Sequence, residues 1–327
     1  MKTRFVILLC ALLAVLLLIG LNLFAHPSLL SDSVEQHIFM QLSLPIMITA
    51  ILVGSALSMS SATLQVVLNN PLADPGIIGI SSGASLCAGI VIIGGILPSS
   101  ALVWGLPIAC FIGALLSSAL IFRLAQRLKL THAGVILAGI AISTVCAAVL
   151  AWLYILGDAQ ATRNLTFWLM GSFAHTHYPI LGVAGTALIL GMTVLIRERS
   201  HLNTLYLGHH NAQLLGVEPK HLTRKLLIVC ALLVGVSVSI AGSIAFVGLL
   251  VPHILRRLLG RDNRLIIPLS GIVGAALMLV IVNINHLLSG VILPVSLLTA
   301  TIGGPIFIYV LYQGQILTRA SGSQRHV

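Results

Sequence analysis

The sequence is poor in acidic residues, and those that it has avoid its long apolar stretches. Of 327 residues only 7 are Asp or Glu, against 17 Lys and Arg, and 58% are hydrophobic. A soluble domain carries far more charge than this. Ion-coupled transporters usually keep carboxylates at membrane depth. The scarcity of acidic residues therefore excludes a soluble protein and argues against an ion-coupled secondary transporter. Such a transporter stays as the alternative hypothesis from a different class of protein.

Two motifs that would give the chain a chemistry of its own are also missing. There is no G-x-x-x-x-G-K-[ST] sequence, so the chain is not expected to hydrolyse nucleotide or to be an enzyme. The 5 cysteines fall in apolar stretches and form no C-x-x-C pair. They are expected to be buried thiols, not disulfides or metal ligands. No metal site or cofactor is expected, and any uphill transport would take its energy from another subunit.

What the sequence does have is a series of apolar stretches. Stretches of about 20 such residues are typical of helices that cross a membrane. We expect an all-α polytopic membrane protein, a single domain over residues 1–327, with about ten transmembrane helices. The expected spans are 5–25, 44–68, 82–97, 102–122, 133–156, 179–196, 226–241, 244–259, 266–288 and 294–316. A shorter helix is expected at 164–173, before the sixth span.

The basic residues are distributed unevenly about these spans. Sixteen of the 17 Lys and Arg fall on one side of the expected membrane, and only Arg163 falls on the other. Lys and Arg are enriched in cytoplasmic loops. The side rich in Lys and Arg, with both termini, is therefore expected to be cytoplasmic. The formal net charge of +10 is then a sign of topology, and nucleic-acid binding is not expected.

The segment from Asn69 to Ser85 interrupts the apolar pattern. Its two prolines lack backbone donors and its glycines permit unusual dihedral angles, so it cannot be one regular helix. Non-helical backbone at membrane depth survives only where protein buries it or a water-filled cavity lines it. The segment is interpreted as part of a pathway or gate, with an ordinary interhelical loop as the alternative. The candidate gate and pathway residues are Asn70, Pro71, Asp74, Pro75, Gly76, Gly79, Ser82 and Gly83, with Gln65 in the preceding span.

The longest loop on the basic side, 197–225, is a second candidate region. Residues 211–215 can form a short helix, stopped by Gly216 and then by Pro219. A short helix across the cytoplasmic face would suit docking to a partner protein. A solvated connector is the alternative.

Four parts of the sequence match motifs of one known family. They are Asn70-Pro71-Leu72-Ala73-Asp74-Pro75-Gly76-Ile77-Ile78-Gly79 followed by Ser82-Gly83-Ala84; Trp168-Leu169-Met170-Gly171-Ser172; Leu207-Gly208 with Ala212, Leu215 and Gly216; and Phe246, Gly248, Pro252, His253 and Arg256 with Gly260, Asp262 and Arg264. In these motifs the sequence resembles the permease subunits of type II ABC importers, the FecCD family, which carry iron-siderophores, haem and vitamin B12. The resemblance covers nearly the whole chain.

This resemblance implies a fold, a location and partners. The fold would be that of a type II ABC importer permease in the inner membrane. Members pair as dimers, here with a second copy or a paralogue. They bind two cytoplasmic ATPase subunits and receive substrate from an extracytoplasmic binding protein. The coupling loop, 197–225, would dock on the ATPase. The expected coupling residues are Gly208, Ala212, Leu215, Gly216, Val217, Arg256 and Asp262.

The cargo that the resemblance favours is a ferric siderophore, with haem and vitamin B12 as alternatives. A zinc or manganese ABC permease is the second hypothesis within transport, because the expected outer face carries several histidines. These are His26, His37, His175, His177 and His286. Zinc usually needs more ligands than the pair His175 and His177 supplies. Membrane lipid is the expected surrounding.

The sequence departs from the family at its expected outer face. Where the family has R-L-P-R at the start of the second span, this chain has Ser43-Leu44-Pro45-Ile46. Late in the ninth span, His286 stands at the family's basic position. The family's outer-face arginines pair with acidic residues of the binding protein, and lost rim charges weaken steering more than fold. Ser43, Ile46 and His286 are therefore expected to form an atypical docking surface, or to mark a chain that pairs with a different permease.

Overall fold

The computed structural model describes residues 14–20, 33–128, 132–174, 176–288 and 293–322, and this part of the chain contains helices and no strand. The helices are α2 (Ser33–Ile38), α3 (Leu44–Val67), α4 (Pro75–Ile78), α5 (Ile80–Gly94), α6 (Ser99–Arg127), α7 (His132–Leu156), α8 (Ala159–Leu169), α9 (Tyr178–Leu205), α10 (His209–Leu214), α11 (Pro219–Ala241), α12 (Val247–Leu259), α13 (Asn263–Leu287) and α14 (Val295–Gly322). A π-helical segment, Phe39–Ser43, joins α2 to α3. Residues 14–20 are also helical.

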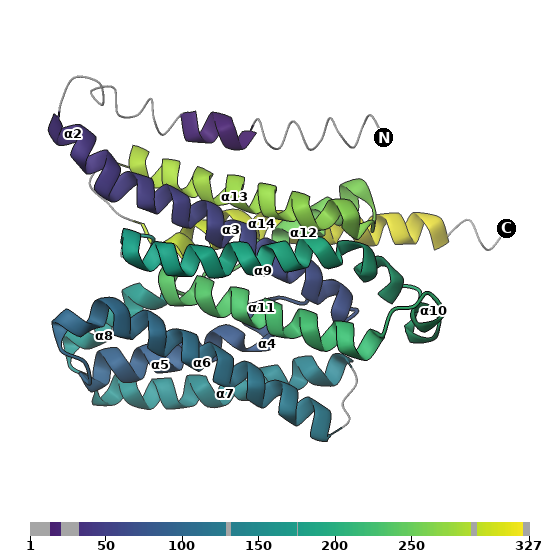
Figure 1. Cartoon of the computed structure of the whole chain (residues 1–327), viewed down its shortest axis with the longest axis horizontal. Helices are drawn as coiled ribbons and strands as arrows, with labels where there is room; N and C mark the ends of the chain where they lie inside the picture. Colours follow the sequence, from purple (N-terminus) through teal and green to yellow (C-terminus); the bar gives the residue numbers. More distant parts are fainter. Residues whose placement is uncertain (1–13, 21–32, 129–131, 175, 289–292, 323–327) are drawn as a thin grey trace.

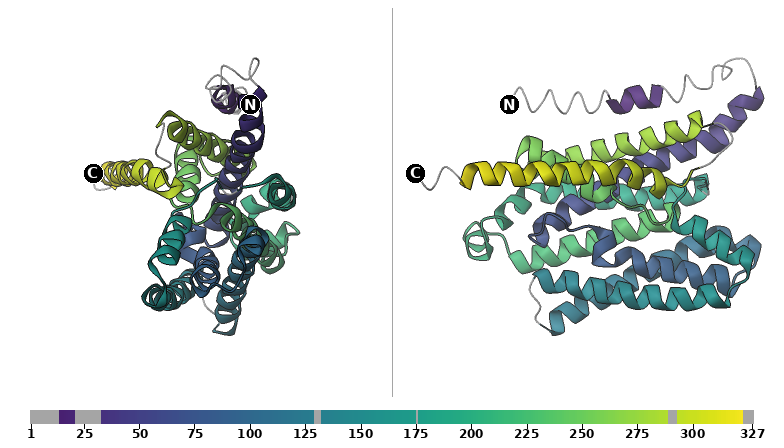
Figure 2. Two further views of the ribbon diagram at one scale, coloured as in Figure 1. Left: turned by 90° about the vertical axis from the view of Figure 1, so that its left-hand side faces the viewer. Right: turned by 180° about the vertical axis from the view of Figure 1, so that it is seen from behind.

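The long helices lie side by side along the long axis of the molecule (Figure 1). Helices α5, α6, α7 and α8 form one side, and α3, α13 and α14 the other, with α9 and α11 between them. The end-on view in Figure 2 shows α14 standing out from the rest of the bundle. The short helix α10 projects from one end of the molecule, at the turn between α9 and α11.

Helix α3 is the element around which the others pack. It contacts α13, α11, α9 and α12, and most of its side chains are buried. Small residues allow the close approach: a Cβ added at Gly54 would lie 2.4 Å from the Gly274 carbonyl oxygen of α13. Ser55 Oγ also donates a hydrogen bond to the Gly271 carbonyl oxygen (2.9 Å). Small residues join helices well in a membrane, where apolar burial between helices offers little.

The prediction of an all-helical membrane protein is confirmed. Among the described residues, 6 helices are long and apolar enough to cross a membrane, and two shorter apolar helices accompany them, Ile80–Gly94 and Val295–Tyr309. The 6 are Ser33–Val67, Ser100–Arg127, Gly134–Leu156, Tyr178–Leu205, Pro219–Ala241 and Asn263–Leu287. The expected first span, 5–25, lies mostly outside the described residues.

Two expected elements differ from the structure. The eighth expected span, 244–259, is the 13-residue α12, which at 1.5 Å per residue extends only about 20 Å. The short helix expected at 164–173 is α8, which runs from Ala159 to Leu169. It begins earlier because Asp158 Oδ1 accepts a hydrogen bond from the Ala161 N–H (2.8 Å). It ends before Gly171, whose φ is +74°.

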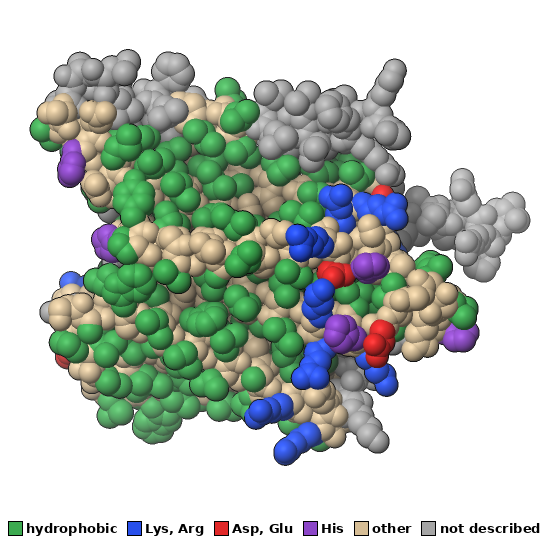
Figure 3. Space-filling model, in the orientation of Figure 1, with side chains coloured by type: hydrophobic (Ala, Val, Ile, Leu, Met, Phe, Trp, Pro, Cys, Tyr) green, Lys and Arg blue, Asp and Glu red, His purple; other side chains and the backbone are tan. Residues whose placement is uncertain are grey.

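Lys and Arg side chains gather at one end of the molecule, the end from which α10 projects (Figure 3). We call this the basic end. Helices α3, α9, α12 and α13 each place one terminus there, and α14 ends there as well. The sides between the two ends are mostly apolar. This arrangement is the one that the uneven distribution of basic residues predicts for a membrane protein.

Candidate functional site

A compact turn leads from α3 toward α4 and forms the first part of the candidate gate segment, residues 69–85. Asn70 closes it: its Oδ1 accepts a hydrogen bond from the Leu72 N–H (2.9 Å), and its carbonyl oxygen accepts one from the Ala73 N–H (3.1 Å). Pro71 is exposed, and Ala73 is buried. The asparagine side chain thus replaces backbone partners that a regular helix would supply. The prediction that this stretch is not one regular helix is confirmed.

The second half of the gate segment is the single-turn helix α4. Asp74 caps it, because Oδ2 accepts a hydrogen bond from the Gly76 N–H (3.0 Å), and Pro75 follows in the first turn. Gly79 ends α4 with φ +89°. A residue with a side chain rarely adopts this conformation, so glycine is needed here. The chain then turns directly into α5.

A cavity of about 220 Å³ lies beside this segment. It is lined by Gly76, Ser81, Ser82, Ser85, Ser143, Cys146, Ala147, Leu150, Leu169 and Ser243. Ser82 Oγ donates a hydrogen bond to Ser143 Oγ (2.9 Å), which joins α5 to α7 at the cavity wall. The wall therefore offers hydroxyl groups and no charged side chain. Ser243 lies in non-helical backbone between α11 and α12, and non-helical backbone next to a cavity is the arrangement that a membrane tolerates.

Two candidate gate glycines serve close packing. A Cβ on Gly79 would lie 2.8 Å from the Gly139 carbonyl oxygen of α7. A Cβ on Gly83 would lie 2.2 Å from the Gly113 carbonyl oxygen of α6. Helices α4 and α5 are thus pressed against α7 and α6, with no space for a side chain between them.

Asp74 also anchors the gate segment to α3 and α12. Its Oδ1 accepts a hydrogen bond from Ser61 Oγ of α3 (3.2 Å). A Cβ added at Gly248 of α12 would lie 2.1 Å from Ser61 Oγ and 2.6 Å from Asp74 Oδ1. Two motifs far apart in the sequence, around Asp74 and around Gly248, therefore meet at this hydrogen bond.

We expect Gly248→Ala to break this contact. The added methyl group overpacks the Ser61–Asp74 pair, and such changes lower the free energy of unfolding by about 1–3 kcal/mol. Thermal unfolding in detergent measures the loss. Ser61→Ala in the same chain removes one of the two clashing oxygens and should restore part of the stability. Gly304→Ala is the control, because nothing lies within 4 Å of its added Cβ. Equal stability of the Gly248 and Gly304 variants would contradict the prediction.

The turn after α8 meets the ends of two long helices, α11 and α14. The Val295 N–H donates to the Gly171 carbonyl oxygen (3.0 Å), and the Ser296 N–H donates to the Met170 carbonyl oxygen (3.0 Å). The Ser172 N–H donates to the Ala241 carbonyl oxygen (3.0 Å). The turn after α8, the end of α11 and the start of α14 thus satisfy one another's backbone groups, as buried non-helical backbone must.

The candidate coupling loop is shorter than the expected 197–225, because α9 continues to Leu205 and α11 begins at Pro219. It holds α10, which confirms the expected short helix. Gly208, with φ +88°, precedes it, and Gly216, with φ +79°, follows it. Ala212 is fully buried. Leu214 and Leu215 are 75% and 60% exposed. An exposed apolar patch on a projecting helix at the basic end indicates a surface that a partner covers.

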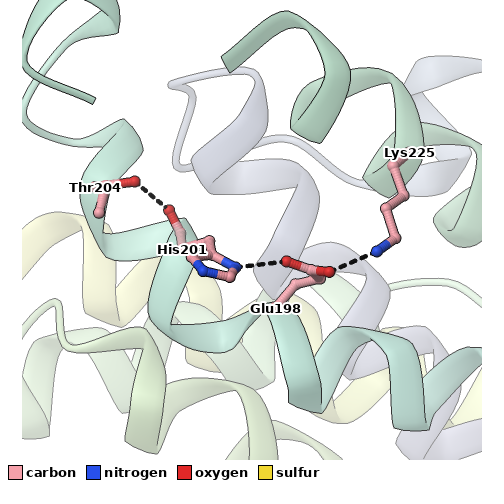
Figure 4. Close-up of polar contacts among 4 residues, drawn as sticks. All are labelled: Glu198, His201, Thr204 and Lys225. Atoms are coloured by element: carbon pink, nitrogen blue, oxygen red, sulfur yellow. Dashed lines mark hydrogen bonds and ion pairs between the residues drawn. The ribbon is translucent and has the colours of Figure 1, made fainter. Parts of the chain in front are cut away.

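An ion-pair cluster joins α9 to α11, the two helices on either side of α10 (Figure 4). Glu198 of α9 accepts from Lys225 Nζ of α11 at 2.5 Å, and its other oxygen lies 2.7 Å from His201 Nδ1. Thr204 Oγ1 donates to the His201 carbonyl oxygen (2.7 Å). The cluster ties the two helices on either side of the coupling loop to each other.

The other candidate coupling residues lie in different surroundings. Arg256 of α12 is half-buried and directs its guanidinium at α3, where Nε donates to Gln65 Oε1 (3.2 Å). Asp262 caps α13, with Oδ1 accepting from the Arg264 N–H (3.1 Å). Val217 packs on the hydrophobic core. The structure therefore brings the candidate gate residue Gln65 into contact with the candidate coupling residue Arg256.

The candidate docking residues lie at the end opposite α10, where α3 begins and α13 ends. His286 is exposed, and Ser43 is half-buried. Ile46 packs partly buried against the hydrophobic core, so it is less available to a partner than a rim arginine would be. Their role in docking stays a prediction.

Sequence reasoning missed several residues of the site. Gly139, Ser143 and Cys146 of α7 face the gate segment or its cavity. They stand in an apolar stretch without a motif, so only their small size among larger residues could have indicated them. Among the described residues, no group of three His, Cys, Asp or Glu side chains could hold a metal ion.

Comparisons with known proteins agree with this geometry. The chain is 37% identical over 298 residues to the vitamin B12 import system permease protein BtuC of Vibrio cholerae, covering 90% of this chain and 88% of the relative. It is 36% identical over 277 residues to the hemin transport system permease protein HmuU of Yersinia pestis, covering 84% and 83%.

A solved structure has the same fold. It is described as an inward-facing conformation of a metal-chelate type ABC transporter, with a TM-score of 0.81 and 32% identity, covering 91% of this chain and 99% of the other. A model of the FecCD transport family matches residues 5–313. Fold, motifs and relatives agree over nearly the whole sequence, and the chain therefore belongs to the FecCD transport family of ABC importer permeases.

Proposed function

We propose that this chain is the membrane-spanning subunit that moves a large metal chelate across the cytoplasmic membrane, driven by ATP hydrolysis on a separate subunit. The observation that carries the proposal is the cavity beside the gate segment, where α4 and the start of α5 meet α7, the end of α8 and the non-helical residue Ser243. A wall with hydroxyl groups and no fixed charge suits passage of a ligand that is already chelated, because it offers no strong binding site.

The named relatives narrow the choice of cargo. The two named above are described as permeases for vitamin B12 and for hemin. A metal bound in a tetrapyrrole or corrin ring is therefore the first choice, and the ferric siderophore expected from the sequence is the second. A zinc or manganese permease is the alternative, but the described residues hold no cluster of metal ligands in support of it.

The proposal includes partners and an orientation. Two ATPase subunits would bind at the basic end, which would face the cytoplasm. An extracytoplasmic binding protein would dock at the end that carries Ser43, Ile46 and His286. A second copy or paralogue of the chain would complete a pathway between two permeases. The exposed leucines at the end of α10, Leu214 and Leu215, support the ATPase site. The candidate coupling residues in α10 or within three positions of it are Gly208, Ala212, Leu215, Gly216 and Val217.

Uptake by cells tests the proposed function. A strain lacking the gene, with and without its restoration, would receive labelled haem, a labelled corrinoid, labelled ferric siderophores, zinc and manganese in separate assays. We expect restoration to recover uptake of one chelate and of neither free metal. Recovery of zinc or manganese uptake would establish the alternative. Uptake that persists when the partner ATPase is inactivated would overturn the mechanism.

We expect Leu214→Ser to weaken binding of the ATPase. The variant removes an exposed apolar side chain whose burial is worth about 1.5–3 kcal/mol, which corresponds to about tenfold to a hundredfold in affinity. Co-purification of the ATPase with the permease measures the change. Leu156→Ser is the matched control, because Leu156 is 77% exposed and lies at the other end of the bundle, at the end of α7. Equal losses in the two variants would contradict a docking role for α10.

A further inference from the structure

The ends of four helices are joined at the basic end by one chain of polar contacts centred on Arg256 of α12. Its Nε donates to Gln65 Oε1 (3.2 Å) and its Nη2 to the Ala62 carbonyl oxygen (2.8 Å), both on α3. Its Nη1 donates to Asn263 Oδ1 on α13 (3.0 Å). One guanidinium therefore fixes the end of α3 to the start of α13.

Asn203 extends this chain of contacts to α9. Its Oδ1 accepts from the Asn263 N–H (2.8 Å) and from Asn263 Nδ2 (2.9 Å). Its Nδ2 donates to Asp262 Oδ1 (2.9 Å). Asn263 is fully buried between the two. We call the path Asn203–Asn263–Arg256–Gln65 the polar chain.

The two ends of the polar chain lie beside the two candidate functional segments. Asn203 is in the last turn of α9, shortly before Gly208 and the coupling helix α10. Gln65 is in the last turn of α3, shortly before Asn70 and the gate segment. The Glu198–Lys225 ion pair holds α11 to the same part of α9. A displacement of α10 therefore acts on α9, and α9 is connected through Asn263 and Arg256 to Gln65, at the start of the gate segment.

Stability alone does not require charged and amide side chains at this place. Arg256 is half-buried, so its guanidinium carries part of a desolvation penalty, and well-packed apolar residues are often as stable or more so. The contacts of Arg256 that the structure shows are to neutral oxygens of Gln65, Asn263 and Ala62. A role in stability alone therefore explains these residues poorly.

Gln65 has a side-chain donor without a protein partner, in this arrangement of the helices, within the part of the chain that the structure describes. Its side chain is only 4% exposed, and among the described residues its Nε2 has no hydrogen-bond partner. The amide cannot be turned over to relieve this, because Arg256 Nε can only donate and must face Oε1. Buried polar groups are nearly always bonded, so an orphaned donor needs an explanation. A rotation or shift of the end of α3 would give Nε2 a partner in the other state of a gate.

We propose that the polar chain transmits movement of α10 to the gate segment. Arg256 is then a positioning residue, which acts through Gln65 and not by contact with cargo or nucleotide. The inference rests on the proposed function, since it assigns the connection between the ATPase site and the gate. A connection of this kind needs an element that has two discrete arrangements. Both sites must change the equilibrium between these arrangements. The end of α3, with its half-satisfied Gln65, is that element.

The test uses the complete importer, with its ATPase and binding protein, in proteoliposomes. Arg256→Lys keeps the positive charge but loses the planar set of donors that contacts three residues at once. Asn203→Ala removes the link to α9. We expect cargo moved per ATP to fall about tenfold in both variants, a typical size for coupling between sites, and Asn203→Ala to hydrolyse ATP at nearly the normal rate. Arg123→Lys, at an exposed arginine of α6, is the control and should change neither quantity.

The double variant Asn203→Ala with Arg256→Lys separates transmission from unrelated damage. If both residues belong to one path, the double variant should be no worse than the poorer single one. Effects that multiply would overturn the proposal, because they indicate independent contributions. A fall in ATP hydrolysis in proportion to transport would also overturn it, since the polar chain would then serve assembly. If Arg256→Lys fails to fold, the comparison rests on Asn203→Ala, which leaves Arg256 in place.

A second readout does not depend on knowing the cargo. Cys146 lines the cavity beside the gate, and in a chain without its other cysteines a thiol reagent would report access to it. We expect ATP to change the labelling rate of Cys146 in the parent chain and not in Arg256→Lys or Asn203→Ala. If ATP changes the labelling rate of Cys146 in these variants as much as in the parent chain, the proposed role of the polar chain is wrong. Absence of transport for every chelate, with a normal ATP response in the parent, would instead contradict the proposed cargo.

Discussion

A Gly274→Ala variant should lose much of its stability, because α3 and α13 touch backbone to backbone at this point. The added Cβ would lie 2.2 Å from Ser58 Oγ and 2.3 Å from the Gly54 carbonyl oxygen. Neither helix can move away easily, since α3 is packed by four neighbours. We expect a loss of about 3 kcal/mol, at the upper end for overpacking, and a fall in Tm of about 5 °C.

Thermal unfolding of the purified chain in detergent checks this, together with the amount of folded protein recovered. Gly182→Ala is the matched control, because Gly182 also lies in a long helix and nothing is within 4 Å of its added Cβ. The control should unfold at nearly the parent temperature. A Gly274 variant as stable as the control would show that α3 and α13 are farther apart than the structure has them.

A Gly139→Ala variant should fold and yet lose transport. Its Cβ would lie 2.3 Å from the Ile78 carbonyl oxygen, in the last turn of α4. The added Cβ clashes with the short helix α4, which can move away. In Gly274→Ala, by contrast, the clash is between two long helices. Separation of α4 from α7 would then be favoured by about 1–3 kcal/mol, which shifts the balance between two gate states by about tenfold or more. Transport should fall accordingly.

The measurement is uptake by cells or proteoliposomes, compared with thermal unfolding of the same variant. We expect the Tm to change much less than in Gly274→Ala, while uptake falls by about tenfold or more. Gly182→Ala again serves as the control for both quantities. Normal uptake in Gly139→Ala would contradict a role for the contact between α4 and α7 in the gate.

The sequence predicted those parts of the site that local chemistry determines. The break in the helix between Asn69 and Ser85 follows from its prolines and glycines, so its place could be read directly. Helix α10 was predicted in the same way, from Gly216 and Pro219, which follow it. These are the places where the backbone must leave the helical region, and few residues permit that.

The contacts between distant segments could not be predicted. Nothing near Asn203 or Asn263 indicates that they bond to each other across 60 positions. The length of α12 was overestimated because an apolar run can be a membrane span or a shorter buried helix, and periodicity does not separate them. Gly139 looked like one more small residue of an apolar helix until the structure placed Ile78 against it.

The meeting of the turn after α8 with the start of α14 also constrains the order in which the protein can be made. The carbonyl oxygens of Met170 and Gly171 accept from the N–H groups of Ser296 and Val295. During synthesis these acceptors leave the ribosome long before their donors do. The first half of the bundle must therefore wait in the membrane, with two carbonyl groups held by water or by the insertion machinery, until the last helix arrives. A chain released before α14 is synthesised would keep that defect permanently, which makes it a natural substrate for membrane proteases.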